Sequence, residues 1–135
     1  MSGFSVEGAA KPKGSTRAFI PKGWSRAIVT AASPKTKIWE KQVRLKAIQE
    51  GFSEQPGPFR VALQFVLPRP KRLKENPKHT TRPDVDKLSR CILDALTGVV
   101  WLDDAQVVAL RASKRYARAG EVPRVDIRLG GGRGL

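Results

Sequence analysis

Apolar and polar residues alternate along two segments of the chain, and this two-residue period predicts β-strands with one buried face. In the first segment, residues 59–67, the odd-numbered positions are all apolar, and Arg60 and Gln64 lie between them. In the second, residues 124–129, apolar and charged side chains alternate throughout. Weaker patterns predict strands at residues 4–7 and 107–116, and two extended segments within 17–32, around the turn Pro21-Lys22-Gly23.

Two other segments have the 3.6-residue period of helices. Residues 84–97 place Val85, Leu88, Ile92 and Leu96 on one face, and Gly98 suits the end of the helix. Residues 35–52 follow a Ser33-Pro34 start and carry a looser apolar stripe. That stripe consists of Ile38, Leu45, Ile48 and Phe52. We predict a short extended piece at 99–101, a turn at 117–121, and a loop at 68–83, which has four prolines and six Lys or Arg residues.

These elements predict one small α+β domain, with a mixed or mostly antiparallel sheet and two main helices packed on it. The 135 residues suffice for one hydrophobic core but not for two. We expect the domain to span residues 1–130 and the glycine-rich tail, residues 131–135, to be disordered. Trp39 and Trp101 are expected in the core, while Trp24 could be in the core or stack on a base.

Charge distinguishes this chain from most domains of its size. It has 26 Lys and Arg against 12 Asp and Glu, a net charge of +14, which predicts a polyanionic partner. No apolar run approaches the roughly 20 residues of a membrane span, and the N-terminus lacks the apolar region of a signal peptide, so we expect a cytoplasmic protein that binds nucleic acid. With one Cys91 and one His79 the chain can form neither an internal disulfide nor a zinc site, and both residues are interpreted as bystanders.

The basic residues gather in two segments, 11–46 and 69–82, and Glu40 is the only acid in the first. We expect these segments to hold DNA through its phosphates, mostly without reading base sequence. The expected DNA-binding residues are Lys11, Lys13, Arg17, Lys22, Arg69, Lys71, Arg72, Lys74 and Lys87.

Acids are scarce, yet five of the twelve lie within 21 residues, at Asp84, Asp86, Asp94, Asp103 and Asp104. A carboxylate cluster repels phosphate unless it binds a cation. Mg²⁺ is the natural candidate, because it takes carboxylate, water and phosphate oxygens, and Mn²⁺ is expected to substitute for it. The structural alternative is that Asp84 caps a helix, Asp86 favours the helix dipole, and Asp103-Asp104 forms a turn.

Two cations, Arg90 and Lys114, have both a chemical and a structural interpretation. Arg90 lies four residues from Asp86 and four from Asp94, which predicts either solvated ion pairs or a positive charge beside the acids. Lys114 falls on the core-facing row of the 107–116 strand. There it requires a carboxylate or a DNA phosphate as partner, or else its stem snorkels to water.

The stretch RPDVDKLSRCILDALTGVVWLDDAQVVALRASKRY, residues 82–116, resembles the core signature of the RusA family of Holliday junction resolvases. The shared pattern is an Asp-x-Asp that opens a helix, then Asp-Ala-Leu, an aromatic residue, Asp-Asp-x-Gln-Val, and a lysine ten residues beyond the second of these aspartates. The earlier PKGSTRAF, the helix around Trp39 and the strand leading into LPRPK follow the order of the family, so the resemblance covers most of the chain.

The resemblance implies residue roles by position. Asp84, Asp86 and Asp104 match the essential carboxylates thought to hold Mg²⁺, Asp103 matches the neighbouring acid, and Lys114 matches a recurrent basic position. Two positions depart from the family. Lys87 stands where it usually has Asn, and Arg90 stands where it usually has a catalytically important lysine.

The resemblance also implies the activity: a homodimeric, Mg²⁺-dependent endonuclease that resolves four-way Holliday junctions by paired nicks in DNA recombination and repair. Arg90 or Lys114 would stabilise the developing negative charge, and the products would carry 5′-phosphate and 3′-hydroxyl ends. The alternative is a catalytically inactive, basic nucleic-acid-binding protein with the same fold, which Lys87 and Arg90 leave open.

Overall fold

The computed structural model describes residues 2–14, 17–20, 22–23, 28–30, 33–73, 75 and 77–131. Its strands are β1 (Ser2–Glu7), β2 (Arg17–Phe19), β3 (Ile28–Thr30), β4 (Phe59–Leu67), β5 (Val107–Tyr116) and β6 (Arg124–Gly131). Its helices are α1 (Pro34–Gln49), α2 (Val85–Leu96) and one short 3₁₀ turn (Asp104–Gln106). The predicted α+β class is confirmed, as are the strands at 59–67, 107–116 and the C-terminal end.

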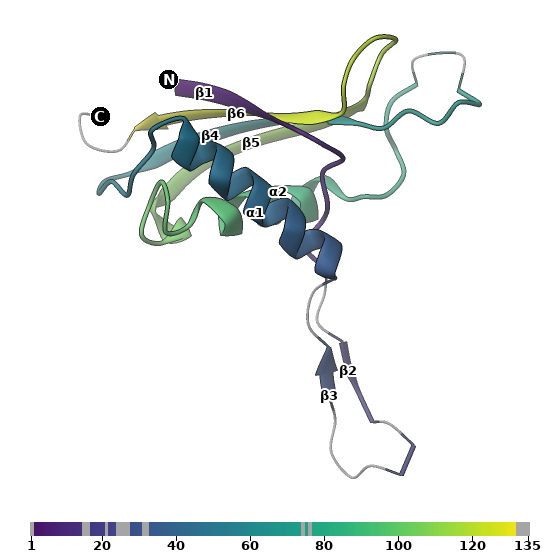
Figure 1. Ribbon diagram of the computed structural model, residues 1–135, viewed down its shortest axis with the longest axis horizontal. Coiled ribbons are helices and arrows are strands. Elements are labelled where there is room, and N and C mark those ends of the chain that lie inside the picture. Colours follow the sequence, from purple (N-terminus) through teal and green to yellow (C-terminus); the bar gives the residue numbers. More distant parts are fainter. Residues whose placement is uncertain are drawn as a thin grey trace.

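Four strands form the main sheet, in the order β1-β6-β4-β5. β4 pairs antiparallel with β6 and parallel with β5, so the sheet is mixed. A parallel pair requires a crossover connection, and α2 supplies it on the same face of the sheet that α1 covers (Figure 1). β2 and β3 pair antiparallel as a separate ribbon, which confirms the two extended segments predicted within 17–32.

The hydrophobic core lies between the sheet and the two helices. The odd-numbered residues of β4 point into it, and Phe65 is fully buried. α2 contributes the stripe predicted from its period, since Leu88, Ile92 and Leu96 are all fully buried. Trp39 and Trp101 are core residues as predicted, at 2% and 0% exposure. The long strand β4 therefore lies at the centre of the fold, with a strand on either side.

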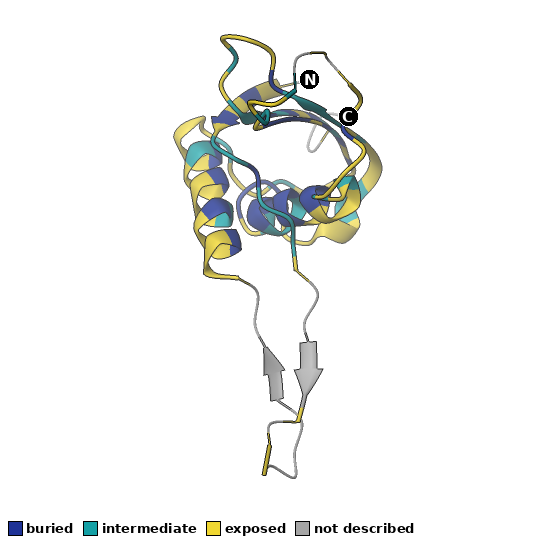
Figure 2. Cartoon of the chain, turned by 90° about the vertical axis from the view of Figure 1, so that its right-hand side faces the viewer, coloured by how far each residue is buried: buried dark blue, intermediate teal, exposed yellow. Residues whose placement is uncertain are grey.

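The predicted buried face of α1 is wrong. Ile38, Leu45 and Ile48 are exposed, and the buried positions of the helix are Thr36, Trp39, Val43 and Ala47 (Figure 2). Both sets follow a helical period, so spacing alone could not choose between them. The Trp39 side packs because Gly8 leaves room for it: a Cβ on Gly8 would lie 2.9 Å from the indole ring.

The segment after α2 also differs from the prediction. Residues 98–100 form a turn and Trp101 makes only an isolated bridge with Thr97, so there is no short strand at 99–101. Gly98 ends the helix with a φ of 87°, a conformation that glycine adopts without strain. Trp101 then turns back into the core and its Nε1 donates a hydrogen bond of 3.0 Å to Thr97 Oγ1.

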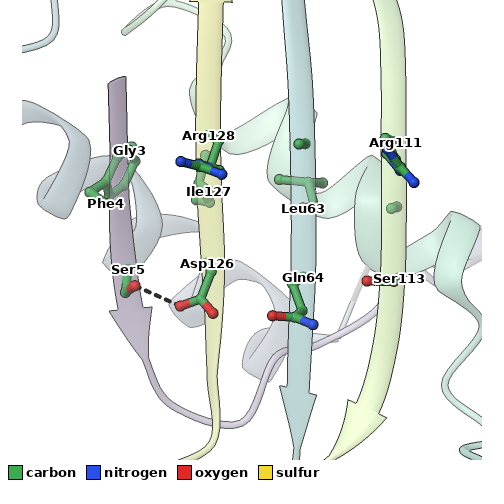
Figure 3. Close-up of a pocket in the computed structure, with 12 residues that line it drawn as sticks. Gly3, Phe4, Ser5, Leu63, Gln64, Arg111, Ser113, Asp126, Ile127 and Arg128 are labelled. Carbon is green, nitrogen blue, oxygen red and sulfur yellow. Dashed lines mark hydrogen bonds between the residues drawn. The ribbon is translucent and has the colours of Figure 1, made fainter. Parts of the chain in front are cut away.

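No helix of the described ranges covers the other face of the sheet, which carries polar side chains such as Arg111 and Arg128. Figure 3 shows the hollow over it, with Arg128 and Arg111 on either side of β4 and Ser5 bonded to Asp126 at 2.6 Å. The strand register explains the arrangement, since Gly3, Arg128, Ala62 and Arg111 form one row across the four strands. Small side chains alternate with arginines along this row.

No helix in the described part of the chain is long and apolar enough to cross a membrane. Trp24, Lys74 and residues 132–135 of the predicted tail fall outside the described residues, whereas Gly131, predicted as the first residue of the disordered tail, is the last residue of β6. The predictions made for the residues outside the described ranges stay predictions.

Candidate active site between α2 and β5

A hollow of about 430 Å³ lies between α2 and the edge strand β5. Three charged residues line it: Asp86 and Arg90 from α2, and Asp104 from the 3₁₀ turn before β5. Leu110 and Ala112 of β5 form an apolar wall beside them. The structure therefore brings two of the predicted metal ligands and the predicted charge-stabilising arginine to one place, although 18 positions separate Asp86 from Asp104 in the sequence.

The 3₁₀ turn is held rigidly, and this determines which of the two adjacent aspartates is available. Asp103 is the cap, because its side chain accepts a hydrogen bond of 2.9 Å from the N–H of Ala105. Gln106 Oε1 in turn accepts from the N–H groups of Leu102 and Asp103, while Gln106 Nε2 donates to the carbonyl of Gln55 at 2.9 Å. Asp103 thus has the structural role that the sequence left open, and Asp104 is the acid that lines the hollow.

Asp86, Arg90 and Asp104 form no ion pair with any residue that the structure describes. One interpretation of Arg90 was that it forms solvated ion pairs with Asp86 and Asp94. In the part of the chain that the structure describes, these pairs are not formed. Asp94 pairs instead with Lys13, at 3.1 Å. All three groups of the hollow are exposed and available to a ligand.

Asp84 does not line this hollow. It is the N-cap of α2, without a capping hydrogen bond from its side chain, and its Oδ2 lies 3.6 Å from Lys87 Nζ. Positions two apart at a helix start point to different sides, so Asp84 and Asp86 face different hollows. No group of three His, Cys, Asp or Glu side chains placed to hold a metal ion occurs in the described part of the chain.

Lys114 lies on the helix side of β5, opposite Phe65, as predicted. Its Nζ donates hydrogen bonds to two backbone carbonyls, Thr81 O at 2.6 Å and Pro83 O at 2.9 Å. From the sequence we expected Lys114 to pair with a carboxylate or a DNA phosphate, or to reach water. Within the described structure its ammonium binds backbone carbonyls instead. Lys114 fastens the segment directly before Asp84 to the sheet, a positioning role that sequence reasoning missed because backbone carbonyls leave no mark in the sequence.

His79 was interpreted as a bystander, but it packs against Tyr116, next to the segment that Lys114 holds. Its ring lies 4.3 Å from that of Tyr116, and Tyr116 Oη lies 3.4 Å from Thr81 Oγ1. Burial lowers the pKa of His79, and the neighbouring Lys114 charge lowers it further. Cys91 is buried in the core, where burial raises the pKa of its thiol to about 12, so it takes no part in the site.

The residues predicted to bind DNA fall into different environments. Lys11, Arg72 and Lys87 line a second hollow beside the start of α2. Lys13 lines it too, but its ammonium is bonded to Glu40 at 2.8 Å, and this hydrogen bond raises its pKa. Arg69 bonds to carbonyls of its own loop, including that of Leu73 at 3.1 Å. Lys22 and Lys71 are exposed, and only the backbone of Arg17 is described here.

Comparison with known proteins identifies the family of this chain. A family model described as "Endodeoxyribonuclease RusA" matches residues 9–130, which covers both helices and all the residues of the candidate site. The chain is also 30% identical over 138 residues to "Uncharacterized protein YqaN" of Bacillus subtilis (strain 168), in an alignment that covers 93% of each protein.

Proposed function

Because this chain belongs to the RusA family of endodeoxyribonucleases, we propose that it is a structure-selective nuclease that resolves four-way DNA junctions by paired nicks. The single observation that carries the proposal is the hollow between α2 and β5. There two carboxylates and a guanidinium meet, none of them ion-paired with a described residue, in a chain of net charge +14. The net positive charge would attract a polyanion such as DNA. Carboxylates at the place where its phosphates bind would repel them unless a cation lies between.

The donor set fits a hard divalent cation. Mg²⁺ typically binds one or two carboxylates and completes its shell with water and substrate phosphate. Asp86 and Asp104 would hold it, because both are exposed in the hollow and neither is used by another described side chain. Asp84 faces the other side of the helix start, beside Lys87 at 3.6 Å, so we do not assign it to this shell. Mn²⁺ would substitute, because its ligand preferences are similar.

When bound, Mg²⁺ would neutralise the scissile phosphate and lower the pKa of a water that attacks it. The chain's own residues do the rest. Arg90 lines the same hollow as Asp86, and its guanidinium would stabilise the negative charge that develops on the phosphate oxygens. Water would attack phosphorus and form a new P–O bond while the P–O3′ bond breaks. O3′ would leave and take up a proton to become the 3′-hydroxyl, and the phosphate would stay on the 5′ carbon of the other end, so a ligase could seal the nick.

A second candidate is a nucleic-acid-binding protein of the same fold without activity. The observation that favours it is the pair of departures from the family signature, Lys87 and Arg90. A guanidinium is planar and less compact than an ammonium, so it would contact the phosphate differently.

One experiment separates the two candidates. A synthetic four-way junction is incubated with the protein and Mg²⁺, with EDTA, and with the variants Asp86→Asn and Glu7→Gln. We expect the wild type to make ligatable nicks in Mg²⁺ but not in EDTA. In Mg²⁺, Asp86→Asn should not cleave, and Glu7→Gln, which removes an exposed carboxylate from β1, should cleave normally. Junction binding should persist in Asp86→Asn, because the variant loses a charge that repels phosphate. Binding without cleavage by the wild type would support the inactive candidate.

A further inference from the structure

A second hollow, of about 610 Å³, lies on the opposite side of the first turn of α2 from the candidate active site. Three segments enclose it: residues 9–14, residues 68–72 and residues 79–84. We call it the basic hollow. Its volume is within the range of about 300–1,000 Å³ that is common for sites of small organic ligands. The mechanism proposed above makes no use of it.

The lining of the basic hollow is divided by polarity. Its apolar lining includes the buried Ala10 and Leu67, the half-buried Tyr116 and four prolines. Five Lys and Arg residues also line it, Lys11, Lys13, Arg72, Arg82 and Lys87, and of these Lys13 is bonded to Glu40 and Asp94. Among the described lining residues Asp84 is the only acid, and Lys87 is its partner. A ligand that fits must therefore combine a flat, weakly polar body with one or more negative charges.

The walls of the basic hollow are held in place before any ligand arrives. The N–H of Lys13 donates to the carbonyl of Lys87 at 3.0 Å, and Thr36 Oγ1 donates to the carbonyl of Pro12 at 3.1 Å. On the opposite side, Lys114 holds the carbonyls of Thr81 and Pro83. A preformed site loses little entropy on binding, which favours a specific ligand over a general electrostatic surface.

From this lining we propose that the basic hollow captures one unpaired nucleotide of the DNA substrate, with its base on the apolar surface and its flanking phosphates on the cationic rim. The inference rests on the proposed function, because it takes branched DNA as the substrate. A base inside a continuous duplex is paired and stacked, and releasing it costs a few kcal/mol. At a branch point the stacking is already interrupted, so the same hollow would select branched DNA without reading its sequence.

The position of the basic hollow connects capture to cleavage. Asp84 lies in this hollow and Asp86, two residues later, lies in the candidate active site. A strand whose branch-point nucleotide occupies the basic hollow would therefore run across the start of α2, toward Asp86 and Arg90. Structure selectivity and strand placement would then have the same physical origin.

The test uses a four-way junction that carries 2-aminopurine, a base whose fluorescence rises when it is unstacked. The probe is placed either at the branch point or in the middle of an arm, and the wild-type protein is added in EDTA so that no strand is cut. We expect a severalfold rise in emission at a branch-point position and none in the arm.

Two sets of variants check that the basic hollow is responsible. Gly14→Trp adds a large side chain at its edge without strain, since a Cβ on Gly14 meets nothing within 4 Å, and Gly14→Ala is its control. The double variant Lys11→Ala/Arg72→Ala removes two rim charges, and Lys35→Ala/Lys41→Ala removes two exposed charges from α1. We expect the emission rise to be lost in Gly14→Trp and in the rim variant, with junction affinity about tenfold lower in Gly14→Trp. Both controls should keep it.

The outcomes separate this inference from the proposed function. An emission rise that persists in both Gly14→Trp and the rim variant, or no rise at any branch-point position, overturns nucleotide capture, even when cleavage in Mg²⁺ is normal. A rise that depends on the basic hollow in a protein that never cuts supports capture and refutes the nuclease proposal.

Discussion

Replacing Lys114 with methionine should destabilise the protein, and the size of the effect tests whether this lysine has a positioning role. The ammonium donates to Thr81 O at 2.6 Å and to Pro83 O at 2.9 Å. Methionine keeps the apolar stem and its packing beside Phe65 but can donate to neither carbonyl. The substitution therefore isolates the two hydrogen bonds from the rest of the side chain.

The magnitude follows from the character of these bonds. A hydrogen bond that involves a charged group contributes about 1.5–3 kcal/mol net. The bond to Thr81 is exposed to solvent and belongs at the low end of that range, while the bond to Pro83 is partly buried. We expect Lys114→Met to lower the free energy of unfolding by about 3–4.5 kcal/mol, a large fraction of the roughly 5–15 kcal/mol that is usual for a domain.

Urea unfolding followed by circular dichroism measures this difference directly. Arg111→Met is the matched control, because Arg111 lies on the same strand, is exposed on the open face of the sheet, and should change stability by about 0.5 kcal/mol or less. If Lys114 acted only on the transition state, its variant would lose activity at unchanged stability. A loss of stability no larger than that of Arg111→Met would refute the positioning role.

Three further predictions concern charge and assembly. Junction affinity should fall about 10³–10⁵-fold between about 50 and 200 mM salt if roughly six to ten phosphates are contacted, and a filter-binding series that shows little salt dependence would contradict a phosphate-binding surface. Arg115 lowers the pKa of Glu121 from its usual 4.5 to about 2, so the stability that the ionised Glu121 contributes is present above pH 4.5 and is lost as the pH falls toward 2. The melting temperature of Glu121→Gln should therefore fall less steeply than that of the wild type over this pH interval. Parallel curves of melting temperature against pH would contradict the ion pair's contribution. Sedimentation at micromolar concentration should give about twice the chain mass of 14.9 kDa, because paired nicks in a four-way junction need two sites related by a twofold axis, and a stable monomer would exclude paired cleavage by one particle.

The local elements of this fold were predictable because each has a short-range signature. Alternation in 59–67 and 124–129 predicted β4 and β6, and the period of 84–97 predicted α2 with the correct buried face. α1 shows the limit of such signatures. Its exposed stripe, with Ile38 and Ile48, is as periodic as its buried one, and tertiary packing, including the close approach of Trp39 to Gly8, distinguishes the two.

The candidate site was predictable in composition and only partly in arrangement. The acids of 84–104 and the nearby cations were identified from residue type and spacing, and Asp86, Arg90 and Asp104 do line one hollow. Which aspartate caps a turn and which one faces the hollow depends on the bonds of Asp103 and Gln106. Those bonds reach Gln55, 51 positions away from Gln106, which no local pattern encodes.

By itself, then, the sequence determined the elements, the α+β class, the attraction to a polyanion and the identity of the acidic cluster, because periodicity, charge and residue type are properties of the chain before it folds. Tertiary structure alone decided how those side chains are used. It directs Asp84 and Asp86 to different hollows, commits Lys13 to Glu40 and Asp94, and commits Lys114 to backbone carbonyls. The physical reason is that a charge takes whichever partner the packing of distant segments brings within hydrogen-bonding distance, and that partner is often a backbone group or a residue far away in the sequence.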